Sequence, residues 1–270
     1  MKRTIVSILV CLLVGSVAAI AQDLVCTGRA LNFPSKKYGI SIGNSREFSG
    51  VRINFADCNV KQVNGLNITF WLKLYQNQEA VVNGINLGVI PTAKAMGPIN
   101  IGLLGVGSSH GNMSGITIAG FVLGSGGDIN GLSFSGLLTM ADGNSSEISG
   151  VAISGFGLGA NKAINGLAIA GMGLGTNGEI NGIAGSLFYI KGGKHVRGIA
   201  LTAGYLEADT LSGIGIAGYV KTKSSNGLSL GICNQADELH GIQFGLLNYA
   251  GNNPKEFRML PLLNLHFGKK

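Results

Sequence analysis

The chain has 270 residues, a formal net charge of +7, 45 glycines and only 5 prolines. Its hydrophobic fraction of 46% and charged fraction of 12% exclude a disordered protein, and the scarcity of proline excludes collagen. Glycine at one residue in six, against a usual level of about 7%, argues against helices, so a glycine-rich, largely β protein remains.

The N-terminus has the pattern of a secretory signal peptide. Lys2 and Arg3 precede the almost purely apolar residues 4–18, and a small-x-small cleavage site ending at Ala21 comes directly before Gln22. No later stretch reaches the 18 apolar residues of a membrane-spanning helix. We therefore expect an exported protein, located in the outer membrane or at the cell surface.

The basic residues do not form a stripe along the chain. Residues 95–161 contain neither lysine nor arginine, whereas a nucleic-acid-binding protein clusters its basic residues on one face. Nucleic acid is therefore not an expected partner.

Three cysteines remain after the signal peptide, at Cys26, Cys58 and Cys233. One disulfide between Cys26 and Cys58 is one alternative in an oxidising compartment, and buried free thiols are the other. Three distant cysteines do not supply the four close ligands of a structural zinc site.

A repeat of about 16 residues runs through most of the chain. Its pattern is polar, glycine, aliphatic, small, aliphatic, small, glycine, as in the copies that begin at Ser149 and Asn165. A weaker copy begins at Gly39. The leading glycines of the other copies are Gly50, Gly65, Gly84, Gly97, Gly115, Gly131, Gly150, Gly166, Gly182, Gly198, Gly213, Gly227 and Gly241.

Each repeat is expected to hold a β-strand, because its large residues alternate with smaller ones. Leu66, Ile68 and Phe70 share one phase, and Asn67 and Thr69 have the other. In the central copies the phase of the large residues changes at the second glycine, which leaves two interpretations open.

A β-solenoid is the favoured interpretation. If Gly171 is a corner, then the four large residues around it point into one core, and the next coil stacks on this one through backbone hydrogen bonds. Those residues are Leu167, Ile169, Met172 and Leu174. This interpretation predicts that Ile169→Asp destabilises the protein strongly and that Ala168→Asp is tolerated. It also predicts a stacked ladder of the asparagines before the leading glycines, namely Asn83, Asn130, Asn165, Asn181 and Asn226.

The alternative is an antiparallel outer-membrane β-barrel of about 14 strands. The uncharged segments have about the 10-residue length of a membrane strand, and residues 259–267 would supply a closing strand. Against it, the change of phase would turn methionine or leucine toward a water-filled lumen, which should be polar.

The sequence divides into four segments. Residues 1–21 are the signal peptide, residues 22–82 an N-terminal β region or cap, residues 83–251 the repeat domain, and residues 252–270 a C-terminal strand or cap. Proline is absent between Pro98 and Pro254, as expected where every backbone N–H is needed in a ladder.

The sequence contains no pattern that predicts catalysis or cofactor binding. Gly173, Gly175 and Gly178 match the dinucleotide-binding fingerprint, but a further strand repeat follows them and not a helix. The histidines lie singly in different repeats, without a second ligand at metal-binding spacing; they are His110, His195, His240 and His266.

Carboxylates recur at one turn of the repeat, at Asp128, Glu147 and Glu179, but more sparsely than in calcium-binding repeats. We therefore expect no catalytic, cofactor-binding or metal-binding residues, and no enzyme.

The repeats beginning at Asn165, Asn226 and His240 resemble glycine-rich repeats of uncharacterised bacterial surface proteins, chiefly from spirochaetes and Bacteroidetes-type bacteria. They are also loosely similar to head repeats of trimeric adhesins, although this chain has no heptad stalk. The resemblance covers most of the mature chain and transfers no catalytic residue.

The function that follows is that of an exported, non-catalytic surface or outer-membrane-associated protein with a structural or interaction role. An integral barrel acting as a pore or structural protein is the alternative, and a secreted enzyme is a more remote one. The sequence does not identify the partner; candidates are the outer membrane, a cell-surface matrix and further copies of the chain.

Overall fold

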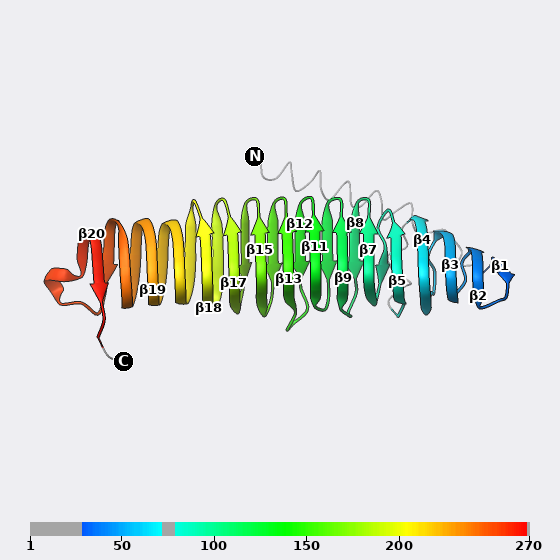
Figure 1. Cartoon of the computed structure of the whole chain (residues 1–270), viewed down its shortest axis with the longest axis horizontal. Helices are drawn as coiled ribbons and strands as arrows, with labels where there is room; N and C mark the ends of the chain where they lie inside the picture. Colours follow the sequence, from blue (N-terminus) through cyan, green and yellow to red (C-terminus); the bar gives the residue numbers. More distant parts are fainter. Residues whose placement is uncertain (1–28, 72–78, 269–270) are drawn as a thin grey trace, which may run out of the picture.

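A computed structural model describes residues 29–71 and 79–268, and it shows one row of stacked coils (Figure 1). The row runs from β1 (Ala30–Pro34) at one end to β20 (Met259–His266) at the other. The predicted signal peptide and Cys26 lie outside the described residues. A single short helical segment, η1 (Lys255–Phe257), precedes β20, and the described residues contain no helix long and apolar enough to cross a membrane.

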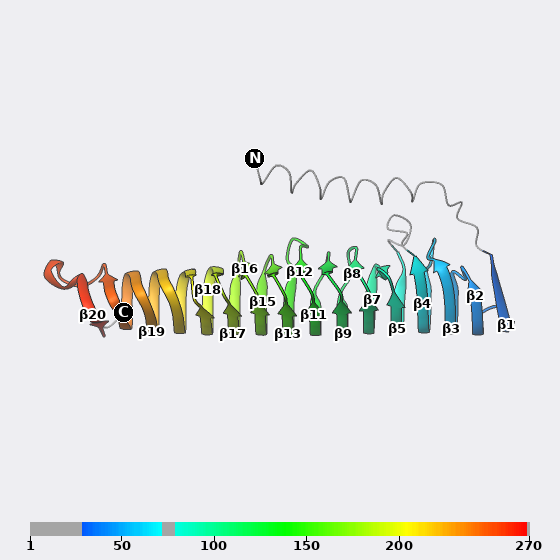
Figure 2. The same cartoon turned by 90° about the horizontal axis from the view of Figure 1, so that it is seen from above.

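Each coil contributes a long strand to one sheet, and from β5 onward each coil also contributes a short strand to a second sheet (Figure 2). The long strands are β2 (Tyr38–Gly43), β3 (Glu47–Ala56), β4 (Gln62–Trp71), β5 (Val81–Gly88), β7 (Ala95–Gly102), β9 (Met113–Ala119), β11 (Ile129–Ser135), β13 (Glu147–Ser154), β15 (Ala163–Ala170) and β17 (Glu179–Ser186). The short strands are β6 (Thr92–Ala93), β8 (Gly105–Ser108), β10 (Val122–Ser125), β12 (Leu138–Ala141), β14 (Gly157–Ala160) and β16 (Gly173–Thr176). Strands β18 (Tyr189–Thr202) and β19 (Tyr205–Ala250) continue the same winding without a break.

Successive coils pair in parallel and in register, which confirms the predicted β-solenoid. Strand β15 lies between β13 and β17, so that Gly166 is aligned with Gly150 on one side and with Gly182 on the other. Among the described strands, antiparallel pairing is confined to β1 with β2 and to β20 with β19. The antiparallel arrangement that a barrel requires is therefore not formed.

The leading glycines allow the coils to approach closely. Gly166 has a φ of +109°, and a Cβ atom at this position would lie 2.2 Å from the carbonyl oxygen of Gly150. The same 2.2 Å separates a Cβ at Gly182 from the carbonyl oxygen of Gly166. Only glycine has both the backbone freedom and the absence of a side chain that this contact needs.

One leading position was predicted wrongly. Pro98, and not Gly97, is aligned with Gly84, while Gly97 is aligned with Asn83. The repeat pattern predicts a glycine at this position of the coil. The pairing of β7 with β5, however, aligns the next residue, Pro98, with the leading glycines of the other coils.

The side of the long strands that faces the core is the opposite of the one predicted. In β15, Ala168 and Ala170 are buried, Leu167 is half-buried and Ile169 is 41% exposed. In β4, Asn67 is likewise buried beside outward-facing aliphatic residues. The alternation of the two sides was predicted, but their orientation was not.

The flattened shape of the coil explains why the large residues of the long strands face outward. Its two sheets are joined by short turns, and the space between them is occupied by Ile164 from the long strand and Leu174 from the short strand. Small residues such as Ala168 fill the remaining interior positions. Of the four large residues predicted inside, only Leu174 is buried, and Met172 lies exposed at the corner.

The interior of the first coils is polar. The Arg52 side chain is fully buried, and its guanidinium donates hydrogen bonds to the Asp57 carboxylate, to Asn67 Oδ1 at 2.7 Å and to Asn44 Oδ1 at 2.9 Å. Asn67 donates in turn to Asn86 Oδ1 of the next coil at 2.8 Å. A buried charge needs such partners, because desolvation without them costs several kcal/mol.

The predicted asparagine ladder is formed in part. Asn181 donates to Asn165 Oδ1 at 2.9 Å, and Asn83 donates to Asn64 Oδ1 at 3.1 Å. Cys58 is in a disulfide, which agrees with one predicted alternative; the partner predicted for it, Cys26, lies outside the described residues.

The first prediction reverses the pair of substitutions that the sequence suggested. Ala168→Asp places an unpaired carboxylate between the two sheets and is expected to lower the free energy of unfolding by about 3–5 kcal/mol. Ile169→Asp lies on the outer side and is expected to cost about 1 kcal/mol or less. Urea unfolding, followed by circular dichroism at concentrations where the midpoint does not depend on concentration, compares them. An equal or larger loss for Ile169→Asp would contradict the orientation.

A second prediction separates two kinds of glycine. Gly166→Ala forces a side chain against the Gly150 carbonyl at positive φ, and is expected to cost about 2 kcal/mol or more. At Gly159 a Cβ would find its nearest neighbour 3.7 Å away, so Gly159→Ala is expected to change stability by less than about 1 kcal/mol. Thermal unfolding midpoints of the two variants test this contrast, and similar midpoints would count against it.

Candidate interaction surface

The outer side of the long-strand sheet carries two adjacent columns of apolar side chains, which we call the apolar face. The register places one residue of each long strand in each column. The first column contains Ile40, Val51, Leu66, Ile85, Ile99, Ile116, Leu132, Val151, Leu167, Ile183, Ile199 and Ile214, and the second contains Ile42, Ile53, Ile68, Leu87, Ile101, Ile118, Phe134, Ile153, Ile169, Gly185, Leu201 and Ile216.

Water reaches much of this face. Ile118 is 41% exposed, Ile183 is 49% exposed and Leu201 is 52% exposed. Single exposed apolar residues are ordinary on a protein surface, but contiguous patches beyond a few hundred Å² mark interaction sites. No residue of the two columns is polar, and Gly185 is the one position listed that lacks a side chain, so the first column keeps the face continuous.

The apolar surface extends around one edge of the solenoid. At the corner after each central long strand, the backbone N–H of one large residue donates to the carbonyl of its counterpart in the preceding coil, as Met172 does to Phe156 at 2.7 Å. These corner residues are Leu104, Phe121, Leu137, Phe156, Met172 and Phe188, and all of them are exposed.

The opposite edge carries ion pairs. Lys162 pairs with Glu147, and Arg197 pairs with Glu179. The hydrogen bond from Arg197 lowers the pKa of Glu179, and the hydrogen bond to Glu147 raises the pKa of Lys162. Asp128 accepts a hydrogen bond from the backbone N–H of Glu147 at 2.9 Å. The recurrent carboxylates of the sequence therefore hold neighbouring coils together at this edge.

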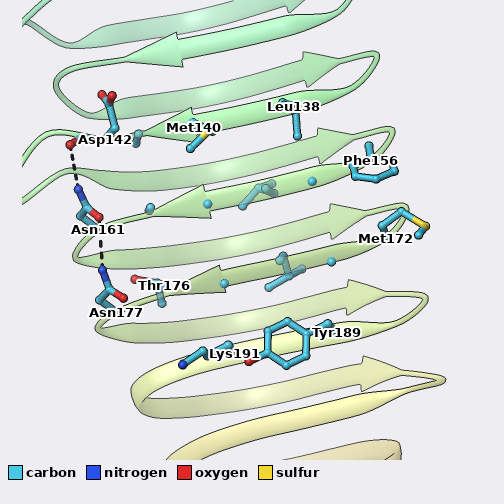
Figure 3. A pocket seen from close by; sticks show the side chains of 18 residues that line it. Leu138, Met140, Asp142, Phe156, Asn161, Met172, Thr176, Asn177, Tyr189 and Lys191 are labelled. Carbon is cyan, nitrogen blue, oxygen red and sulfur yellow. Dashed lines mark hydrogen bonds between the residues drawn. The ribbon is translucent and has the colours of Figure 1, made fainter. Parts of the chain in front are cut away.

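A shallow trough lies on the other sheet (Figure 3). Four glycines of β14 and β16 form its floor, one wall contains Leu138 and Met140 of β12, and the other contains Tyr189 and Lys191 of β18. Its volume is about 550 Å³. The floor glycines are Gly157, Gly159, Gly173 and Gly175, and none has the positive φ of the leading glycines.

Two of these floor glycines belong to the sequence match with the dinucleotide fingerprint. Gly173 and Gly175 lie in β16, and β17 begins at Glu179, directly after Gly178. The match therefore sits between two strands, and no helix N-terminus faces it.

A short column of tyrosines continues from the trough along the short-strand sheet. The rings of Tyr189 and Tyr205 are stacked with centroids 5.7 Å apart, and Tyr219 follows at 5.3 Å from Tyr205. The Tyr189 hydroxyl donates to Glu207 Oε2 at 3.1 Å. Burial, followed by this hydrogen bond, raises the pKa of Tyr189 to about 12.

The fold brings together two histidines that the sequence separates. The rings of His240 and His266 lie edge to face with their centroids 6.0 Å apart, because β20 folds back on β19 and aligns His266 with Gly241. His266 Nδ1 lies 2.7 Å from Asn253 Oδ1. In the part of the chain that the structure describes, no three His, Cys, Asp or Glu residues are grouped to hold a metal ion.

The apolar face was missed in the sequence analysis although its signal was present. The alternation of Leu66 and Ile68 with Asn67 showed a polar and an apolar side, and the apolar side was assigned to the core by default. The buried polar contacts of Asn67 show that the polar side faces inward in that coil.

The raised pKa of Tyr189 predicts a pH dependence of stability. Since the folded pKa lies above the ordinary value of 10.0, the stabilisation is complete below pH 10.0 and is lost as pH rises toward about 12. Tyr189→Phe should reduce this loss but not remove it, because burial also raises the pKa of Tyr205. Urea midpoints of wild type and variant between these two pH values provide the measurement; parallel curves would contradict the prediction.

Comparison of the chain with protein-family models, with curated proteins and with solved structures finds no match. The choice of a functional surface therefore rests on geometry and chemistry. The apolar face and its adjoining corner run along twelve aligned strands, whereas the trough spans β12 to β18 on the other sheet.

Proposed function

We propose that the chain is an exported, non-catalytic surface or outer-membrane-associated protein with a structural or interaction role, and that the apolar face is its contact surface. The observation that carries this proposal is the pair of apolar columns running from β2 into β19, interrupted among their listed positions at Gly185 alone. An isolated soluble protein gains nothing from exposing isoleucine and leucine in register, because each exposed side chain forgoes the free energy of burial.

The distribution of charge supports a contact role. Ion pairs of the central coils lie at the edge opposite the apolar corner, as Lys162 with Glu147 and Arg197 with Glu179. The columns of the apolar face contain no charged residue. The central part of a protein contact surface usually has few charged residues.

Two observations support export. The N-terminal residues have the composition of a signal peptide, with Lys2 and Arg3 before an apolar stretch. Cys58 is in a disulfide, and disulfides persist mainly in oxidising compartments such as the periplasm and the cell surface.

The test uses charges placed on the apolar face. The full chain is expressed in a Gram-negative bacterium as wild type, as the face variant Ile118→Lys/Ile153→Lys, and as a control variant Val122→Lys/Met140→Lys. The two control residues are exposed, as Ile118 is, while Ile153 is half-buried; the control residues lie on the short-strand sheet. Wild type and control should be retained in the cell envelope fraction, with an N-terminus at Gln22, and the face variant should be released from it.

Release is expected because two lysines remove apolar contact area and place charges where a partner would desolvate them. The circular dichroism spectrum of the purified face variant must match that of the control, which shows that the variant is folded. Equal envelope retention of a folded face variant would rule out attachment to the envelope through the apolar face, and an uncleaved chain kept in the cytoplasm would rule out export.

A further inference from the structure

The apolar face has the dimensions of a protein–protein interface. Twelve aligned strands at about 4.8 Å per strand give a length of roughly 58 Å, and two columns along the strands give a width of roughly 13 Å. The resulting area, on the order of 750 Å², exceeds the roughly 300–600 Å² of the largest patch on a typical monomer. It matches the roughly 800 Å² that each partner buries in a stable complex.

We propose that this face packs against the same face of a second copy of the chain, so that two solenoids form a face-to-face dimer. The inference rests on the proposed contact role of the apolar face and names its partner. Two long-strand sheets would then enclose a shared apolar layer, at the spacing of about 10 Å found between packed sheets.

The repeat itself favours a second copy over other partners. The side chains of each column recur at the strand spacing, for example Ile116, Leu132 and Val151 in adjacent coils. A second copy presents the same spacing, so its side chains fit between these along the whole length of the face. A partner without this repeat would match it only locally.

The charge pattern disfavours a lipid surface as the partner. Attraction to anionic lipid requires unpaired basic residues beside the apolar surface. Arg197 precedes Ile199 of the first column by two positions, and its guanidinium pairs with Glu179. Lys162 and Lys223 also pair with carboxylates, Glu147 and Asp209, at the far edge.

The ends of the solenoid direct association to the face. Growth of coils end to end would need an open parallel edge, but both terminal strands run antiparallel to their neighbours. Each also contains a proline, Pro34 in β1 and Pro261 in β20, which lacks the N–H that a further strand would pair with. A two-fold contact between identical faces is closed and does not extend into a fibre.

The experiment determines the mass of the mature chain in solution. Wild type, the face variant Ile118→Lys/Ile153→Lys and the control Val122→Lys/Met140→Lys are compared by light scattering after size exclusion and by sedimentation equilibrium, without detergent. Wild type and control should be dimers at micromolar concentration. The face variant should be a folded monomer, with dimerisation weakened by about 100-fold or more.

Three outcomes would overturn the dimer. These are a monomeric wild type, a face variant that stays dimeric, and a control variant that dissociates as readily as the face variant. If monomeric wild type still pellets with phosphatidylcholine vesicles and the face variant does not, then the face contacts lipid. In that case the dimer fails while the proposed contact role of the face stands.

Discussion

Most coils of this protein place a glycine directly against a carbonyl oxygen of the coil before them, and the rest of the structure depends on that contact. At Gly150, Gly166 and Gly182 the space in which another residue would carry its Cβ is taken by the preceding carbonyl oxygen. The glycines therefore fix which residue lies above which. Once that register is set, the residues that follow the glycine in successive coils are aligned in a column.

This alignment of equivalent residues accounts for the apolar face. An aliphatic residue one position after each leading glycine becomes a line of aliphatic residues along the sheet, and the residue two positions further on becomes a second line. The same geometry produces the asparagine pairs at the neighbouring position and the tyrosine column on the other sheet. A residue type that recurs at one position of the repeat therefore forms a stripe along the molecule.

The fold was largely accessible from the sequence, whereas its orientation was not. The spacing of the glycines and the alternation around Leu66 predicted strands, coils and their order, because both depend on backbone geometry alone. Alternation does not say which side is inward. Ile169 was placed in the core because large apolar residues are usually buried, but the interior already holds Ile164 and Leu174, and Ala168 takes the position between the sheets. The sequence also does not predict that Pro98 is aligned with the leading glycines, because this alignment depends on the register between β5 and β7.

The buried charge of Arg52 has a consequence for how the chain finds its alignment. Copies of a repeat are nearly interchangeable, so a coil could slip by one full repeat and still place a glycine beneath a carbonyl. The cluster of Arg52, Asp57 and Asn67 has no equivalent among the alanines at the same interior positions of the central coils, such as Ala168. A slipped chain would bury this guanidinium without its hydrogen bond to Asn67 of the next coil, at a cost of about 1–3 kcal/mol. One charged residue near the start of the solenoid thereby gives an origin to an otherwise periodic structure, from which the position of each later coil is counted.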